Sequence, residues 1–283
     1  MGSAELTCVA VYQRTVAASL ERVWENARDW EHLPWLHRSS FRSIECVDSG
    51  AWGWRARVGL QAASTAGEIL IELRIEPERL RYVTRTLEGA GRGTEIWTRL
   101  DPVDDARTDI AVEFQLPDVA PEAADSLGAG FIRLYTRLWD EDEAMMRRRA
   151  AELSSRPAQP DVVPGAVALG SLEQLRARLP LQVEYAGRRF RVVEIDGTLL
   201  AHATVCAHAL GPLDDAEVEN GCVRCPWHGY RFDVRTGRSA DGRGLRLATA
   251  PRVVVDAESG QVQLLPSSPA VRRRGSQRGT RRQ

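Results

Sequence analysis

Four cysteine and histidine residues near the C-terminal end of the sequence have the types and the spacing of metal ligands. Cys206 and His208 lie in "CAH", Cys225 and His228 lie in "CPWH", and residues 209–224 separate the two pairs. Two thiolates can hold one iron of a [2Fe-2S] cluster while two imidazoles hold the other, which raises the reduction potential relative to an all-cysteine cluster. Two Cys and two His also suit a tetrahedral zinc ion, so the spacing alone leaves both kinds of site open.

The residues around these pairs resemble the Rieske ferredoxins and the Rieske domains of ring-hydroxylating oxygenases, over roughly residues 163–265. The resemblance depends on "CAHALGPL" and "VRCPWHGYRFDVRTGR", where this sequence matches the family at Gly211, Leu213, Pro226, Gly229, Phe232, Asp233 and Gly237. It implies a [2Fe-2S] cluster rather than zinc. Rieske proteins of respiratory complexes carry an additional disulfide at the positions of Gly211 and Trp227, so that disulfide is absent here, as in the lower-potential clusters of oxygenase systems.

A second pair of histidines, His32 and His37, lies in "DWEHLPWLH" of a chain with only five histidines. Isolated histidines are more often packed or solvated than ligating, and similar segments occur in helix-grip proteins that bind no metal, so one interpretation is a helix end. However, "ENARDWEHLPWLH" also resembles the mononuclear-iron motif of Rieske oxygenases, with Asn26, Asp29, His32 and His37 at its positions. This resemblance implies that His32 and His37 bind Fe(II) and that Asn26 and Asp29 are catalytic residues. It also implies a homotrimer, in which Asp29 links a Rieske histidine to an iron histidine across subunits.

The spacing of this segment allows both histidines to reach one ion. Asp29 and His32 are three residues apart and share one face of a predicted helix. Pro34 is predicted to end that helix, because its ring cannot follow a continuous helical turn, so His37 can converge on the ion bound by His32.

A third ligand is predicted on a long helix from about Pro121 to Leu153, whose apolar stripe includes Phe131, Leu138 and Met145. At about 100° per residue, Asp142 falls in the middle of this stripe and Asp140 on the opposite face. A carboxylate that faces a core is costly unless it is paired or bound to metal. In the resembling oxygenases this helix supplies the third iron ligand. We therefore expect Asp142 to be that ligand, with Asp140 as the second choice. The alternatives are that Asp142 pairs with an arginine such as Arg99 or Arg133, or lies at the helix edge in solvent.

The elements that must position these residues indicate an α+β protein of two domains. A first strand, a helix with Ser19 as N-cap, six further strands and the long helix follow the order of the helix-grip (START/Bet v1-like) fold, whose antiparallel sheet wraps the helix around an apolar cavity. Short strands and turns then indicate a small all-β domain. We therefore expect a catalytic domain at residues 1–153, a linker at 154–165, a Rieske domain at 166–266 and a disordered basic tail at 267–283.

Composition excludes several function classes. The net charge of -1 gives no broad basic field for nucleic acid or an anionic membrane. No stretch approaches the roughly 18 apolar residues that span a bilayer, and the N-terminus lacks the layout of a signal peptide, so we expect a cytoplasmic protein.

Together these features predict a Rieske-type oxygenase with a [2Fe-2S] cluster and a mononuclear Fe(II). It would use O2 and electrons from an external NAD(P)H reductase or ferredoxin to hydroxylate or demethylate a small hydrophobic, aromatic substrate. The Rieske domain precedes the catalytic domain in the usual oxygenase subunit, whereas here it follows. Two alternatives remain: a START-like ligand-binding or cyclase-like domain fused to a ferredoxin-type electron carrier, and a redox-sensing binding module. Both leave His32, His37 and Asp142 dispensable.

Overall fold

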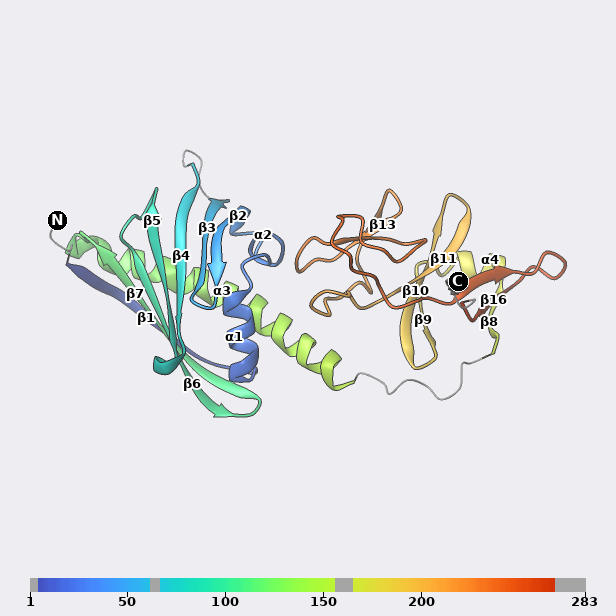
Figure 1. Cartoon of the computed structure of the whole chain (residues 1–283), viewed down its shortest axis with the longest axis horizontal. Coiled ribbons are helices and arrows are strands. Elements are labelled where there is room, and N and C mark those ends of the chain that lie inside the picture. Colours follow the sequence, from blue (N-terminus) through green and yellow to red (C-terminus); the bar gives the residue numbers. More distant parts are fainter. Residues whose placement is uncertain (1–4, 62–66, 156–164, 268–283) are drawn as a thin grey trace, which may run out of the picture.

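The computed structural model describes residues 5–61, 67–155 and 165–267, which form two domains joined end to end (Figure 1). Most of the predicted linker and nearly all of the predicted basic tail fall outside the described residues. The last helix of the first domain ends at Ser154, and the first strand of the second begins at Val167. In the described part of the chain, no helix combines the length and the apolar character that a membrane span requires.

The first domain is a seven-stranded antiparallel sheet that wraps around one long helix, as the sequence predicts. The strand order is β1-β7-β6-β5-β4-β3-β2, and the helix α3 runs along the sheet and continues past it toward the second domain (Figure 1). Its elements are β1 (Leu6–Val16), α1 (Leu20–Arg28), α2 (Leu33–Leu36), β2 (Phe41–Gly50), β3 (Gly53–Leu60), β4 (Ile69–Glu76), the short 3-10 helix η1 (Pro77–Arg79), β5 (Arg81–Glu88), β6 (Glu95–Asp104), β7 (Arg107–Pro117) and α3 (Pro121–Ser154).

Alternating burial along the strands explains how the sheet holds α3. In β7, Ile110, Val112 and Phe114 are buried and alternate with more exposed residues, because successive side chains of a strand point to opposite faces. The ring of Phe114 lies 4.8 Å from those of both Phe131 and Tyr135 on α3. This aromatic contact fixes α3 on the concave face of the sheet.

The start of α1 agrees with the sequence prediction, but its end does not. The Ser19 side chain accepts a hydrogen bond from the backbone N–H of Arg22, as an N-cap does. The prediction that Pro34 ends this helix is wrong, because α1 already ends at Arg28 and Asp29 has an extended backbone. Pro34 instead lies in the first turn of α2, where its missing N–H leaves no hydrogen bond unmade. His32 and His37 therefore lie at the two ends of α2, as its N-cap and C-cap residues.

The second domain is small and all-β apart from one short helix, as predicted. It contains three three-stranded sheets, in the orders β11-β10-β9, β12-β13-β14 and β15-β16-β8. Its elements are β8 (Val167–Ser171), α4 (Leu172–Arg176), β9 (Leu181–Tyr185), β10 (Arg188–Ile195), β11 (Thr198–Ala203), β12 (Val218–Glu219), β13 (Cys222–Arg224), β14 (Arg231–Asp233), β15 (Arg252–Val255) and β16 (Gln261–Leu265). The two Cys-His pairs occupy the loops that follow β11 and β13.

Candidate metal centres at the domain interface

The two loops of the second domain bring the four predicted cluster residues together. Cys206 and Cys225 are each 1% exposed, and the imidazole rings of His208 and His228 lie 4.5 Å apart. Backbone hydrogen bonds close both loops, from Cys206 to Gly211 at 2.8 Å and from Gly229 to Cys225 at 2.9 Å. A Cβ on Gly211 would come within 2.7 Å of the Cys225 sulfur, so a glycine is required where the loops meet.

The surroundings of His228 fit a cluster ligand. Its Nδ1 is buried and has no hydrogen-bond partner among the described residues, while its Nε2 lies 2.6 Å from an Asp29 carboxylate oxygen. Burial disfavours the charged imidazole, but the Asp29 carboxylate and the Cys225 thiol together outweigh burial and raise the pKa of His228 to about 9. Burial likewise disfavours the Asp29 carboxylate, yet the hydrogen bond with His228 and the nearby His32 imidazole hold the pKa of Asp29 well below its usual range. Nδ1 is thus the nitrogen of His228 that could bind iron.

A second group of residues that could bind a metal ion lies in the first domain. One ligand atom each from His32, His37 and Asp142 lies within 4.8 Å of the others, and all three residues are buried. The Asp142 Oδ1 is 3.6 Å from His32 Nε2 and 3.1 Å from His37 Nε2. Asp142 is 8% exposed and faces these histidines.

Two of the residues weighed in the sequence analysis, Asp140 and Arg99, have partners elsewhere. The Asp140 side chain is 59% exposed and forms an ion pair with Arg14. Arg99, one of the suggested partners of Asp142, binds Glu113 instead.

Each imidazole of this trio also has a carboxylate near its other nitrogen. His37 Nδ1 lies 2.6 Å from Glu141 Oε2, and His32 Nδ1 lies 3.7 Å from Asp29 Oδ2. Burial alone would lower the pKa of His37, but Asp142 and Glu141 together raise it. Carboxylates in such positions fix the orientation and tautomer of metal-binding histidines. Glu141 could not be singled out from the sequence, because a charged residue beside Asp142 on a helix gives no separate signal.

Comparison with known proteins decides the nature of the second domain. Residues 165–251 match the family model described as the Rieske [2Fe-2S] domain. The C-terminal part of the chain is a Rieske domain. The four residues that face one another on its two loops are the Cys-His pairs that the sequence resemblance assigns to the cluster.

Curated relatives match this chain over part of their length. The chain is 34% identical over 59 residues to the ferredoxin component of the naphthalene 1,2-dioxygenase system of Pseudomonas aeruginosa, covering 21% of this chain and 57% of that protein. It is 32% identical over 69 residues to the anthranilate 1,2-dioxygenase ferredoxin subunit of Burkholderia cepacia, covering 24% and 64%. It is 29% identical over 140 residues to human apoptosis-inducing factor 3, covering 48% and 23%. The chain therefore spans less than two thirds of the length of these relatives.

Solved structures are also similar to parts of this chain. The ferredoxin of carbazole 1,9a-dioxygenase from Nocardioides aromaticivorans IC177 is 29% identical, with a TM-score of 0.31, and the match covers 37% of this chain and all of that one. The Zhui aromatase/cyclase from Streptomyces sp. R1128 is 18% identical, with a TM-score of 0.41 over 50% of this chain and 94% of that one.

Asp29 joins the Rieske domain to the histidines of the first domain. The same carboxylate oxygen lies 2.6 Å from His228 Nε2 and 3.7 Å from His32 Nδ1. The resemblance implies such a link across subunits of a trimer, whereas the structure makes it within one chain. The homotrimer itself stays a prediction.

A small cavity adjoins the His32–His37–Asp142 trio. Its volume is about 130 Å³, and Asn26 lines it together with these three residues. The Oδ1 atom of Asn26 is buried and has no hydrogen-bond partner among the residues described. The rest of the lining is mainly apolar and aromatic, as the fold resemblance predicts, and includes Leu33, Phe41, Trp54, Ile71, Leu73, Tyr82, Tyr135, Leu138 and Trp139.

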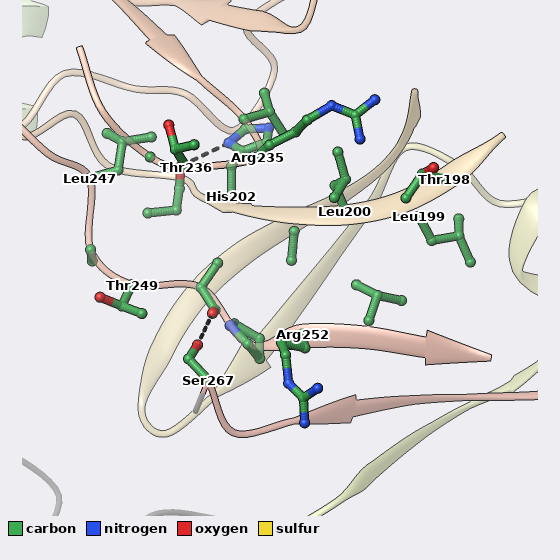
Figure 2. Close-up of a pocket in the computed structure, with 18 of the residues that line it drawn as sticks. Thr198, Leu199, Leu200, His202, Arg235, Thr236, Leu247, Thr249, Arg252 and Ser267 are labelled. Atoms are coloured by element: carbon green, nitrogen blue, oxygen red, sulfur yellow. Dashed lines mark hydrogen bonds between the residues drawn. The ribbon is translucent and has the colours of Figure 1, made fainter. Parts of the chain in front are cut away.

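A larger cavity, of about 420 Å³, lies elsewhere in the Rieske domain (Figure 2). His202, Arg235 and Thr236 line one side of it, and Arg252 and Ser267 line the other. None of the four cluster residues lines this cavity, so it is separate from the metal centres. His202 lies in β11, before the first cluster loop, and is 2% exposed.

Proposed function

We propose that this protein is a Rieske-type non-haem iron oxygenase that hydroxylates or demethylates a small hydrophobic, aromatic substrate. The observation that carries this proposal is the convergence of His32, His37 and Asp142 on one buried point, joined through Asp29 to His228 of the Rieske domain. Two imidazoles and one carboxylate are the ligand set typical of non-haem iron oxygenases.

Different residues of this chain would bind the iron, orient its ligands and hold the substrate. A ferrous ion on such a ligand set keeps positions open for dioxygen, and a Rieske cluster supplies electrons one at a time. His32, His37 and Asp142 would hold the ion, while Asp29 and Glu141 orient the two imidazoles. The apolar cavity beside them would exclude water and hold the substrate. We infer that the electrons come from an external NAD(P)H reductase or ferredoxin, because the sequence has no dinucleotide fingerprint.

A second candidate function is a START-like ligand-binding or cyclase-like domain fused to a ferredoxin-type electron carrier. The relatives that match the Rieske part are named as ferredoxin components of dioxygenase systems, which favours an electron-carrier role for that part. The small volume of the cavity, about 130 Å³, also gives little room for a substrate without rearrangement. In this case the trio of His32, His37 and Asp142 would bind no iron.

Iron stoichiometry separates the two functions. After anaerobic reconstitution with Fe(II), we expect about three irons and two acid-labile sulfides per chain, and an S = 3/2 EPR signal after nitric oxide addition. In His37→Ala, the nitrosyl signal and one iron should disappear while sulfide stays at about two, which controls for an intact Rieske cluster. A wild-type protein with about two irons, two sulfides and no such signal would favour the electron carrier.

A further inference from the structure

A hydrogen-bonded group of three residues crosses the boundary between the domains. Tyr230 of the Rieske domain donates a hydrogen bond to Glu31 of the first domain at 2.5 Å. Arg243, also of the Rieske domain, donates to the Tyr230 hydroxyl at 2.5 Å and lies 3.3 Å from the same Glu31 oxygen. Each of the three therefore contacts the other two.

This group lies directly beside the Asp29–His228 hydrogen bond. Glu31 is two residues after Asp29, and Tyr230 is two residues after His228, so the two cross-domain contacts run in parallel between the same segments. Tyr230 is 5% exposed, and its ring stacks on His208 at 4.4 Å with an interplanar angle of 22°. The Arg243 guanidinium lies 3.9 Å from the centre of the Tyr230 ring. Tyr230 thus touches a cluster histidine and the first domain at once.

A single hydrogen bond does not fix the relative orientation of two domains, because either can pivot about it. A second contact a few ångströms away removes much of that freedom. A charge-assisted hydrogen bond such as that of Glu31 is shorter and stronger than a neutral one, and a buried phenol left without a partner would be destabilising. Glu31 and Arg243 also have opposite charges on the two faces that meet, which favours this docking geometry.

We propose that Glu31, Tyr230 and Arg243 form an interdomain latch, whose residues position His228 against Asp29 within one chain. The latch takes the place of the subunit contact that the sequence resemblance implies. Its contribution to turnover depends on the proposed oxygenase function, but its effect on domain docking does not.

Charge reversal tests the latch in the full chain with its Rieske cluster in place. Glu31→Arg and Arg243→Glu each put like charges together, so amide hydrogen exchange across residues 29–41 should become roughly five- to tenfold faster, and the radius of gyration from X-ray scattering should increase. The double variant restores opposite charges and should recover most of the wild-type protection. Tyr230→Phe, which keeps the ring on His208 but removes the hydroxyl, should give a smaller loss of protection.

Two matched variants control for charge reversal itself. Glu21→Arg changes an acid of the first domain whose side chain is 77% exposed, and Arg235→Glu changes a Rieske-domain arginine paired with the exposed Asp196. Both should exchange across residues 29–41 like the wild type. The proposal is overturned if amide exchange in the single latch variants is as slow as in these controls. It is also overturned if exchange in the double variant is as fast as in the single variants.

A spectroscopic measurement connects the latch to the proposed function. With nitric oxide bound at a third iron, the spin relaxation of the reduced Rieske cluster reports the distance between the two centres, and the single variants should weaken that effect while the charge-swapped double variant restores it. If the wild type binds no third iron, the oxygenase proposal fails. The exchange and scattering results still decide whether the latch exists, because they require only the cluster.

Discussion

One histidine of each pair, His228 and His32, faces the Asp29 carboxylate from opposite domains, yet the other ring nitrogens of these two residues face different surroundings. His228 turns Nε2 to Asp29 and has the Cys225 thiol as another neighbour, whereas His32 turns Nδ1 toward Asp29 and presents Nε2 to Asp142. Thiolates favour iron–sulfur clusters, while a carboxylate with imidazoles suits a ferrous ion that binds oxygen. One shared residue thus separates two environments suited to different iron chemistry.

The two centres also differ in how their residues are assembled. The Rieske residues come from two short loops of one small domain. The other trio combines the two ends of α2 with a side chain of α3 that lies 105 residues from His37. The first centre therefore depends on loop closure within one domain, and the second on the packing of α3 against the segment around α2.

The largest effect should come from removing a thiol at the Rieske centre. Cys225→Ser should abolish the visible absorption of the cluster and the acid-labile sulfide, because one iron loses a thiolate ligand. Cys222→Ser, three residues earlier on β13, is the matched control and should keep both. The nitrosyl signal of the third iron should survive in Cys225→Ser, and its loss would contradict the independence of the two centres.

Removing the carboxylate of the second centre should have the next largest effect. In Asp142→Asn, Fe(II) affinity should fall by more than the roughly 100-fold that loss of an outer hydrogen-bond partner can cause, as measured by anaerobic titration. Asp140→Asn makes the same change on the exposed side of α3 and should leave the affinity unchanged. Equal affinities in the two variants would remove Asp142 from the site.

Breaking the link between the centres should leave both of them loaded. We expect Asp29→Ala to keep its iron and sulfide but to slow reoxidation of the reduced cluster by oxygen in the Fe(II)-loaded protein, by about 10–100-fold, because both imidazoles lose their orienting partner. Asp105→Ala, an exposed aspartate in the turn between β6 and β7, is the control. An unchanged rate would mean that electrons do not depend on this link.

The smallest effect concerns the packing of α2 on the cluster loop. Gly229 has φ of +69°, and a Cβ there would come within 2.1 Å of the Trp35 ring, so Gly229→Ala should lower the free energy of unfolding by about 2–3 kcal/mol. Gly242→Ala has the same φ and open space around it, so it should cost only about 1 kcal/mol of backbone strain. Adding Trp35→Ala to Gly229→Ala should reduce the difference between the two glycine variants. If denaturant unfolding shows the same loss of unfolding free energy in both glycine variants, the Trp35 ring can move away from the added methyl group at no cost.

The sequence was informative where the signal is local. Alternating strands, the phase of α3 and the spacing within two short loops depend on neighbouring residues, so the helix-grip fold, the buried side of Asp142 and the Rieske domain could be predicted. The end of α1 was misplaced because Pro34 can begin a helix as well as end one. Glu141 gains its role through its contact with His37, which could be found only with the helix placed against α2.

The domain interface could not be predicted for a different reason. Glu31 and Tyr230 are 199 residues apart, and Arg243 is 212 residues from Glu31. Helix and strand periodicity shows which face of an element is apolar, but not which loop of another domain will meet it. The resemblance implies that Asp29 and His228 meet across subunits, and in the structure they meet within one chain.

The position of Asp29 and His228 on one polypeptide has a consequence for behaviour in solution. When two sites are covalently joined, each experiences an effective concentration of the other that the chain itself sets, and dilution does not change it. A pairing across subunits would be lost once the protein is diluted below the dissociation constant of the assembly. The pairing in this protein should therefore persist at any concentration at which the chain stays folded.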